Sequence, residues 1–335
     1  MDSFSDSGEL YLIRYQFYTN QHEKVTNYNL EDFSPENQLK VLEYIIRSTI
    51  ELNLDASNLI ENGRSIFPDD LNVFQVLQAW NDLHDFGTDD STYFEDLKEA
   101  KFELQAILTT FYLVKFEKDL NQAIIFLNDY LENLNISTKY NEIEIYLILI
   151  QLNLIRGNYS NVKKIFMQLN QFPEFVKDNI IYQIIESWVK SIQNGNENLN
   201  NCFYFYDEIL NNSFNDDDIK GKIHNLIILF ILNLQLKHYP ESQEILKQIE
   251  NIKLDYEQLS KENDNNNSIK FKDDELDNLL ANQITLDRLI NFGNESEKLL
   301  EELKKINGEH ELIKDEASKN ELFDSIVTKY QTTAV

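Results

Sequence analysis

Glycine and proline are scarce in this sequence, which has 8 glycines and 4 prolines among 335 residues. All-β sandwiches and barrels place both residue types in their hairpin turns. Nucleotide-binding loops need clustered glycines, which let the backbone approach phosphate. No two of the eight glycines lie within five residues of each other: Gly8, Gly63, Gly87, Gly157, Gly195, Gly221, Gly293 and Gly308. These shortages exclude such folds and leave a mainly helical chain.

Cysteine and histidine are also too sparse to predict a metal or disulfide framework. Cys202 is the only cysteine, so no internal disulfide can form, which fits a reducing compartment. The five histidines are separated by more than ten residues from one another, and none has a ligand partner at metal-binding spacing. The first six residues lack the basic and apolar regions of a secretory signal. We expect no cofactor and no metal.

Positively charged residues are also few: the sequence has 30 Lys and Arg and 58 Asp and Glu, which gives a net charge of −28. A chain this acidic repels nucleic acid and anionic lipid head groups. The charge fits a basic or neutral protein partner, or solubility alone. Long apolar runs are absent too, since residues 143–155 and 223–236 are shorter than a membrane span and carry polar residues. They indicate buried helices, so we expect no direct membrane insertion.

What the sequence does contain is a helical pattern that recurs about every 40 residues. Small residues stand just after a polar turn, near the start of an amphipathic helix, at Ala123, Val162, Cys202 and Ser242, with spacings of 39, 40 and 40. A small side chain fits where the two helices of a hairpin come close together. The pattern predicts an all-α, tetratricopeptide-like helical-hairpin solenoid, wound as a right-handed superhelix.

The pattern also predicts the organisation of the chain as a single elongated α-solenoid over residues 1–335. Residues 1–100 form divergent helical pairs, with helices expected at 10–19, 23–28, 39–53, 56–61 and 71–84, followed by one or two more over 93–116. Residues 101–250 hold the regular repeats. Residues 260–275, rich in Asn and Asp, are expected to be a flexible insertion. Residues 276–330 contain the last helices.

Three features with possible chemistry have simpler structural interpretations. Cys202 occupies the small-residue position of a helix pair and is better interpreted as a packed side chain than as a nucleophile. Asp216, Asp217 and Asp218 lack the glycine and closing glutamate of a calcium loop and fit a helix N-terminus. The aromatic run at residues 203–206 has no interleaved Lys or Arg and fits a core. No catalytic residues are predicted, which points to a binding scaffold rather than an enzyme.

Three stretches resemble the coatomer epsilon subunit family of the COPI vesicle coat. They are Glu9-Leu10-Tyr11 with Phe17-Tyr18-Thr19-Asn20, Ser187-Trp188-Val189 with Phe203-Tyr204-Phe205-Tyr206, and the segments at 223–250, 279–292 and 296–303. The resemblance implies a subunit that binds and stabilises the C-terminal domain of the coatomer alpha subunit in retrograde Golgi-to-ER transport. It also implies a cytoplasmic protein that is peripheral on Golgi membranes and vesicles.

Repeat geometry indicates which residues would line the inner groove of such a stack. First-helix residues that point away from the second helix are Leu108, Tyr112, Leu147, Gln151, Ile227 and Ile231. The apolar members fit ordinary core positions equally well. An alternative function is a helical-repeat scaffold subunit of another assembly, such as an N-terminal acetyltransferase auxiliary subunit or a proteasome-lid-like particle.

Overall fold

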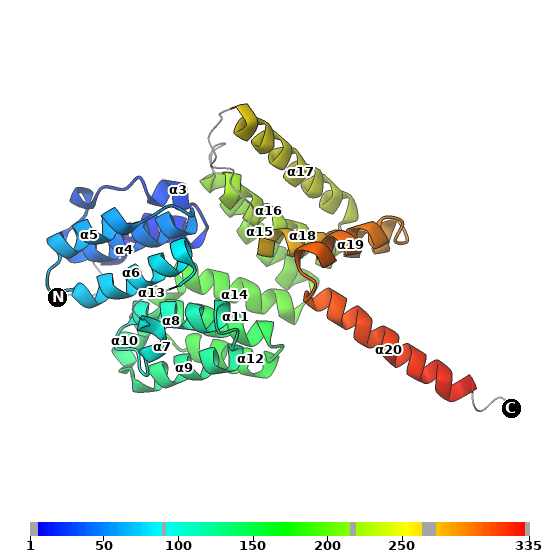
Figure 1. Cartoon of the computed structure of the whole chain (residues 1–335), viewed down its shortest axis with the longest axis horizontal. Helices are drawn as coiled ribbons and strands as arrows, with labels where there is room; N and C mark the ends of the chain where they lie inside the picture. Colours follow the sequence, from blue (N-terminus) through cyan, green and yellow to red (C-terminus); the bar gives the residue numbers. More distant parts are fainter. Residues whose placement is uncertain (1–5, 89–91, 215–218, 263–272, 332–335) are drawn as a thin grey trace. The chain divides into compact units, whose positions relative to one another are not determined.

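The computed structural model describes residues 6–88, 92–214, 219–262 and 273–331, and all regular secondary structure in these ranges is helical (Figure 1). The all-α class and the helical-hairpin arrangement are therefore confirmed. The chain divides into two compact units, residues 1–221 and residues 222–335. The three aspartates at 216–218 and most of the Asn- and Asp-rich insertion lie outside the described residues.

The first unit begins with a series of helices over its N-terminal part. Their bounds are α1 Asp6–Glu9, α2 Tyr11–Tyr18, α3 His22–Val25, a 3₁₀ turn Leu30–Asp32, α4 Pro35–Glu51, α5 Ser57–Ile66, α6 Leu71–Phe86 and α7 Tyr93–Asp96. α4 begins at Pro35, earlier than the apolar pattern indicated, because proline suits the first turn of a helix. α2 packs against α3 and α4 and also against α14, far along the chain.

The regular hairpins follow in the same unit. Their helices are α8 Glu103–Lys115, α9 Leu120–Asn133, α10 Ile136–Asn141, α11 Ile143–Ile155, α12 Tyr159–Leu169, α13 Glu174–Lys177, α14 Ile180–Gln193 and α15 Asn196–Ser213. α8 packs on α9, α11 on α12, and α14 on α15, while α11 also packs on α8 and α14. Each first helix thus contacts its own second helix and the first helix of the neighbouring hairpin.

The small residues that marked the repeat are buried where the pattern placed them. Ala123 lies in α9, Val162 in α12 and Cys202 in α15, and Ser242 takes the same place in α17 of the second unit. The Cys202 thiol donates a hydrogen bond to the Ser187 carbonyl of α14 at 3.2 Å, which ties the two helices of that hairpin together. Burial raises the pKa of the Cys202 thiol, which keeps it protonated. The packed-residue interpretation of Cys202 is confirmed.

The turn between the paired helices has the same hydrogen bonds in two repeats. The amide of Asn158 donates to the Asn153 carbonyl at 2.8 Å, and the amide of His238 donates to the Asn233 carbonyl at 2.9 Å. Such a six-residue closure needs a left-handed residue just before the donor. Gly157 supplies it in the first turn with φ +69°, and Lys237 supplies it in the second with φ +64°. The 80-residue spacing of these turns reflects two repeats.

The second unit holds the rest of the helices. They are α16 Ile219–Leu236, whose first residues belong to the first unit, α17 Tyr239–Glu262, α18 Asp273–Ile290, α19 Ser296–Ile306 and α20 Glu311–Gln331. α17 and α18 extend into the ends of the segment expected to be an insertion. α18 and α19 pack closely around a small core of Leu280, Ile284 and Leu303.

Candidate partner-binding surface

The six predicted groove residues lie on three first helices of the hairpins. Leu108 and Tyr112 are on α8, Leu147 and Gln151 on α11, and Ile227 and Ile231 on α16. Leu108, Tyr112 and Ile227 are buried, Leu147 and Ile231 are half-buried, and Gln151 is exposed. The first four belong to the first unit and the other two to the second.

On α8, the short helix α7 covers part of the predicted face. The ring of Phe94 stacks on that of Tyr112 with centroids 5.3 Å apart and an interplanar angle of 15°. The Tyr112 hydroxyl donates a hydrogen bond to Glu117 at 2.8 Å. Both rings line a cavity of about 580 Å³ together with Thr109. Tyr112 is thus buried by packing and also lines the cavity.

On α11, the predicted face has one covered half and one open half. Glu144, Leu147, Gln151 and Ile155 recur at helical spacing along this face. Glu144 is buried beneath α4, Gln151 is exposed, and Ile155 is 60% exposed. The N-terminal helices therefore cover the first turn of the face and leave its last turns accessible.

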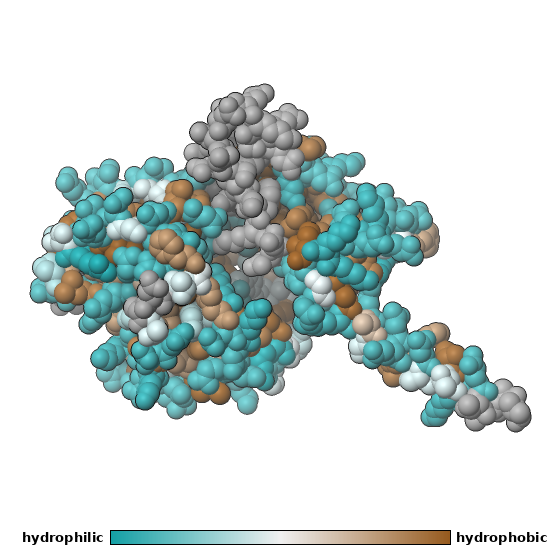
Figure 2. Space-filling view, in the orientation of Figure 1, coloured by the Kyte–Doolittle hydropathy of each residue, from teal (hydrophilic) through white to brown (hydrophobic). Residues whose placement is uncertain are grey.

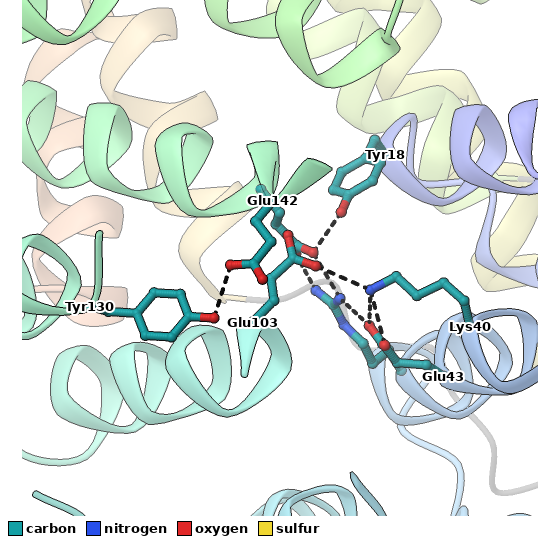
Figure 3. A network of polar contacts seen from close by, with 8 residues as sticks. Tyr18, Lys40, Glu43, Glu103, Tyr130 and Glu142 are labelled. Atoms are coloured by element: carbon teal, nitrogen blue, oxygen red, sulfur yellow. Dashed lines mark hydrogen bonds and ion pairs between the residues drawn. The ribbon is translucent and has the colours of Figure 1, made fainter. Parts of the chain in front are cut away.

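The cover is held in place by a buried polar network (Figure 3). The Arg47 guanidinium of α4 forms an ion pair with both carboxylate oxygens of Glu144, one of them at 3.0 Å from Nη1. The Tyr18 hydroxyl of α2 donates to the same carboxylate at 2.6 Å. Burial would raise the pKa of Glu144, but the Arg47 charge and these hydrogen bonds lower it below its ordinary value. Glu144 is therefore ionised at neutral pH.

Further groups extend the network towards α8. Lys40 Nζ lies 2.8 Å from Glu43 Oε1 and 3.5 Å from Glu103 Oε2, and Arg47 also contacts Glu43 at 3.2 Å. Burial raises the pKa of Glu103 to about 7; Lys40 opposes the shift, and the charges of nearby glutamates, with Glu144 first, reinforce it. Glu103 therefore changes its protonation state near neutral pH.

A parallel contact joins α9 to the start of α11. The Tyr130 hydroxyl donates a hydrogen bond to Glu142 at 2.9 Å. Burial raises the pKa of the Glu142 carboxyl, and this hydrogen bond and the Lys40 charge oppose the shift. Charged and hydroxyl groups thus connect α2, α4, α8, α9 and α11 in addition to their apolar contacts.

This network is suited to holding helices in register. Its cations are paired with carboxylates, and it contains no thiol or aliphatic hydroxyl that could act as a nucleophile beside a base. Across the described ranges, no cluster of three or more His, Cys, Asp or Glu side chains could hold a metal ion. None of the helices in these ranges is both long enough and apolar enough to cross a bilayer.

Sequence reasoning missed the network, although signals for it were present. Glu144 interrupts the apolar helix 143–155, and Arg47 interrupts the apolar stretch of α4. A charged residue on an otherwise buried helix needs a partner. The pattern could have indicated that each of the two residues has a partner of opposite charge. It could not have indicated that they pair with each other.

Stacked helical hairpins with small buried residues at Ala123, Val162, Cys202 and Ser242 define a helical-repeat protein. The particular family follows from comparison with known proteins. The family model described as coatomer epsilon subunit matches residues 6–331, and the chain belongs to that family. It is also 28% identical to coatomer subunit epsilon of Saccharomyces cerevisiae over 196 residues, which are 57% of this chain and 58% of the yeast protein. The matched segment thus covers less than two thirds of the yeast relative.

Proposed function

We propose that this chain is a non-catalytic structural subunit of the COPI coat. It holds the C-terminal domain of the coatomer alpha subunit against the inner face of its hairpins and so acts in retrograde Golgi-to-ER transport. The observation that carries the proposal is the family match over residues 6–331. It favours the coat over the acetyltransferase and proteasome-lid alternatives. The chain is then cytoplasmic and reaches Golgi membranes through the coat.

The open half of the α11 face is the contact that this function requires. Leu147, Gln151 and Ile155 offer apolar and amide groups with no acidic side chain among them. Such a face can bury an apolar segment of the partner without bringing in unpaired charge. The acidic remainder of the chain attracts a partner that is neutral or basic.

The test measures binding of the full chain to the purified C-terminal domain of the coatomer alpha subunit by calorimetry. The variant Gln151→Arg with Ile155→Arg places two charges in the open half of the face. The matched control, Tyr159→Arg with Met167→Arg, places the same charges on exposed positions of α12. We expect the first pair to weaken binding at least tenfold and the control to leave it unchanged, with equal helical circular dichroism. Absence of binding by the unchanged chain refutes the alpha-subunit partner, and equal binding by both variants refutes the α11 face.

A further inference from the structure

The last helix, α20, presents an apolar face that its own unit does not bury. Only its beginning is anchored: Leu312 and Ile313 pack against the small core of α18 and α19, and Glu316 pairs with Arg288 of α18. None of its residues from Glu311 to Gln331 is buried. The helix follows α19 in Figure 1.

The apolar side chains of α20 gather on one side of the helix. Leu322, Phe323 and Ile326 are 61%, 65% and 45% exposed. Ile326 lies four residues after Leu322 and three after Phe323, so the three side chains lie on one side of the helix. Figure 2 shows hydrophobic surface along this helix. Single exposed apolar residues are ordinary on a protein surface, but three within about one turn form an amphipathic face with no cover.

A helix of this kind needs support from packing. Isolated helices of about 15 residues are only marginally stable in water, and most helical stability in proteins comes from burial of an apolar face. The part of α20 after Glu316 has about that length. Its apolar face is therefore the contact through which another surface would stabilise it.

Charge restricts what that surface can be. α20 carries five acidic residues and three lysines, and the whole chain carries a net charge of −28. Two of the acids, Glu321 and Asp324, form no ion pair with the described residues. A second copy of this chain, or an anionic bilayer, would bring like charge against α20. The complementary occupant is an apolar polypeptide surface flanked by lysine or arginine.

We propose that Leu322, Phe323 and Ile326 of α20 dock such a surface on the same partner, the C-terminal domain of the coatomer alpha subunit. This inference rests on the proposed function and adds a second contact that is separate from the α11 face. Glu321 and Asp324 attract the basic flanks of the docked surface, so the contact weakens as salt rises.

The test compares the full chain with the variant Leu322→Gln, Phe323→Gln, Ile326→Gln. Glutamine forms helix well, so the variant removes the apolar face without disfavouring the helix. The matched control, Ser318→Gln with Asn320→Gln, changes only polar exposed positions of α20. Two measurements are made with the alpha-subunit domain: affinity by calorimetry at low and high salt, and amide hydrogen exchange of residues 317–331.

We expect the unchanged chain to form the complex and its α20 amides to exchange at least tenfold more slowly when bound. The triple variant loses at least tenfold in affinity, and the control does not. The variant Glu321→Gln with Asp324→Asn reduces the salt dependence of binding.

Two kinds of failure are distinguishable. A complex that forms with no protection of α20, or with equal affinity for the triple variant, overturns this inference and leaves the proposed function intact. Absence of any complex refutes both. Sedimentation of the unchanged chain as a dimer that the triple variant abolishes, or its binding to anionic vesicles through α20, assigns the face to a different occupant and also overturns the inference.

Discussion

Arg47 of α4 forms a buried ion pair with Glu144 of α11, 97 residues further along the chain. The pair fixes how the N-terminal helices lie on the regular hairpins, because a guanidinium engages both oxygens of a carboxylate in one geometry. Tyr18 adds a hydrogen bond from α2 to the same carboxylate. This junction decides which half of the α11 face is covered and which half is open to a partner.

Removing Glu144 takes away the main counter-charge of buried Arg47, which keeps only its 3.2 Å contact with Glu43. We expect Glu144→Ala to lower the free energy of unfolding by roughly 3 kcal/mol. The double variant Arg47→Met with Glu144→Leu removes both charges and should recover at least half of that loss, because apolar side chains replace a buried pair at little cost. Urea unfolding at pH 7, followed by circular dichroism, measures both. A single variant as stable as the unchanged chain would show that the pair does not hold the junction.

The raised pKa of Glu103 makes the stability of this junction depend on pH. The pKa of Glu103 is about 7 in the folded chain, above its ordinary value of 4.5. Between these two values the folded state binds more protons than the unfolded state, so stability falls as pH rises through this interval. The groups that face this carboxyl are Lys40, Glu43, Glu142 and Glu144. Lys40 compensates only part of the charge that Glu103 gains.

We therefore expect Glu103→Gln to stabilise the chain increasingly as pH rises from 5 to 8, by up to about 3 kcal/mol. The measurement is the difference in unfolding free energy between the variant and the unchanged chain across that range. Glu99→Gln on the exposed surface before α8 serves as the control and should give a flat difference. A flat difference for Glu103→Gln, or one that falls with pH, contradicts the shift.

Much of the fold could be predicted because its signals are local. Each of the small residues Ala123, Val162 and Cys202 packs within its own hairpin, and the apolar periodicity around each of them spans a single helix. The short helices α10 and α13 were missed, because four to six residues cannot show a helical period. The residue pattern thus determined the hairpins better than it determined the segments between them.

The candidate surface was harder to predict because exposure depends on what packs there from elsewhere in the chain. When the small residues are used to align the repeats, Tyr112 and Gln151 fall on first helices at corresponding positions of two repeats. α7 then covers the first, while the second stays exposed. The pairing of Arg47 with Glu144 could not be predicted either, since nothing in the sequence around Arg47 indicates which residue, here 97 positions away, is its partner. The six residues as a partner-binding set remain a prediction.

The two equivalent turns at Gly157 and Lys237 offer a matched experiment. Both residues have left-handed backbone angles, which favour glycine by about 1 kcal/mol over a residue with a Cβ. Lys237 is exposed, so its replacement removes no packing. We expect Lys237→Gly to stabilise the chain by roughly 0.5–1 kcal/mol and Gly157→Ala to destabilise it by about 1 kcal/mol. Thermal unfolding of both variants checks the signs, and a lower midpoint for Lys237→Gly contradicts the shared turn geometry.

Gly63 in the middle of α5 provides the opposite case, in which packing overrides helix propensity. Alanine at an ordinary helical glycine stabilises by up to about 1 kcal/mol. Here a Cβ would overlap the ring of buried Phe74 and lie 2.9 Å from Leu42 Cδ2. We expect Gly63→Ala to destabilise by roughly 1–3 kcal/mol, because the well-packed core must shift. In a Phe74→Leu background, which removes the ring, the same change should cost less than half as much. Equal costs in the two backgrounds would place the strain somewhere other than the α5–α6 contact.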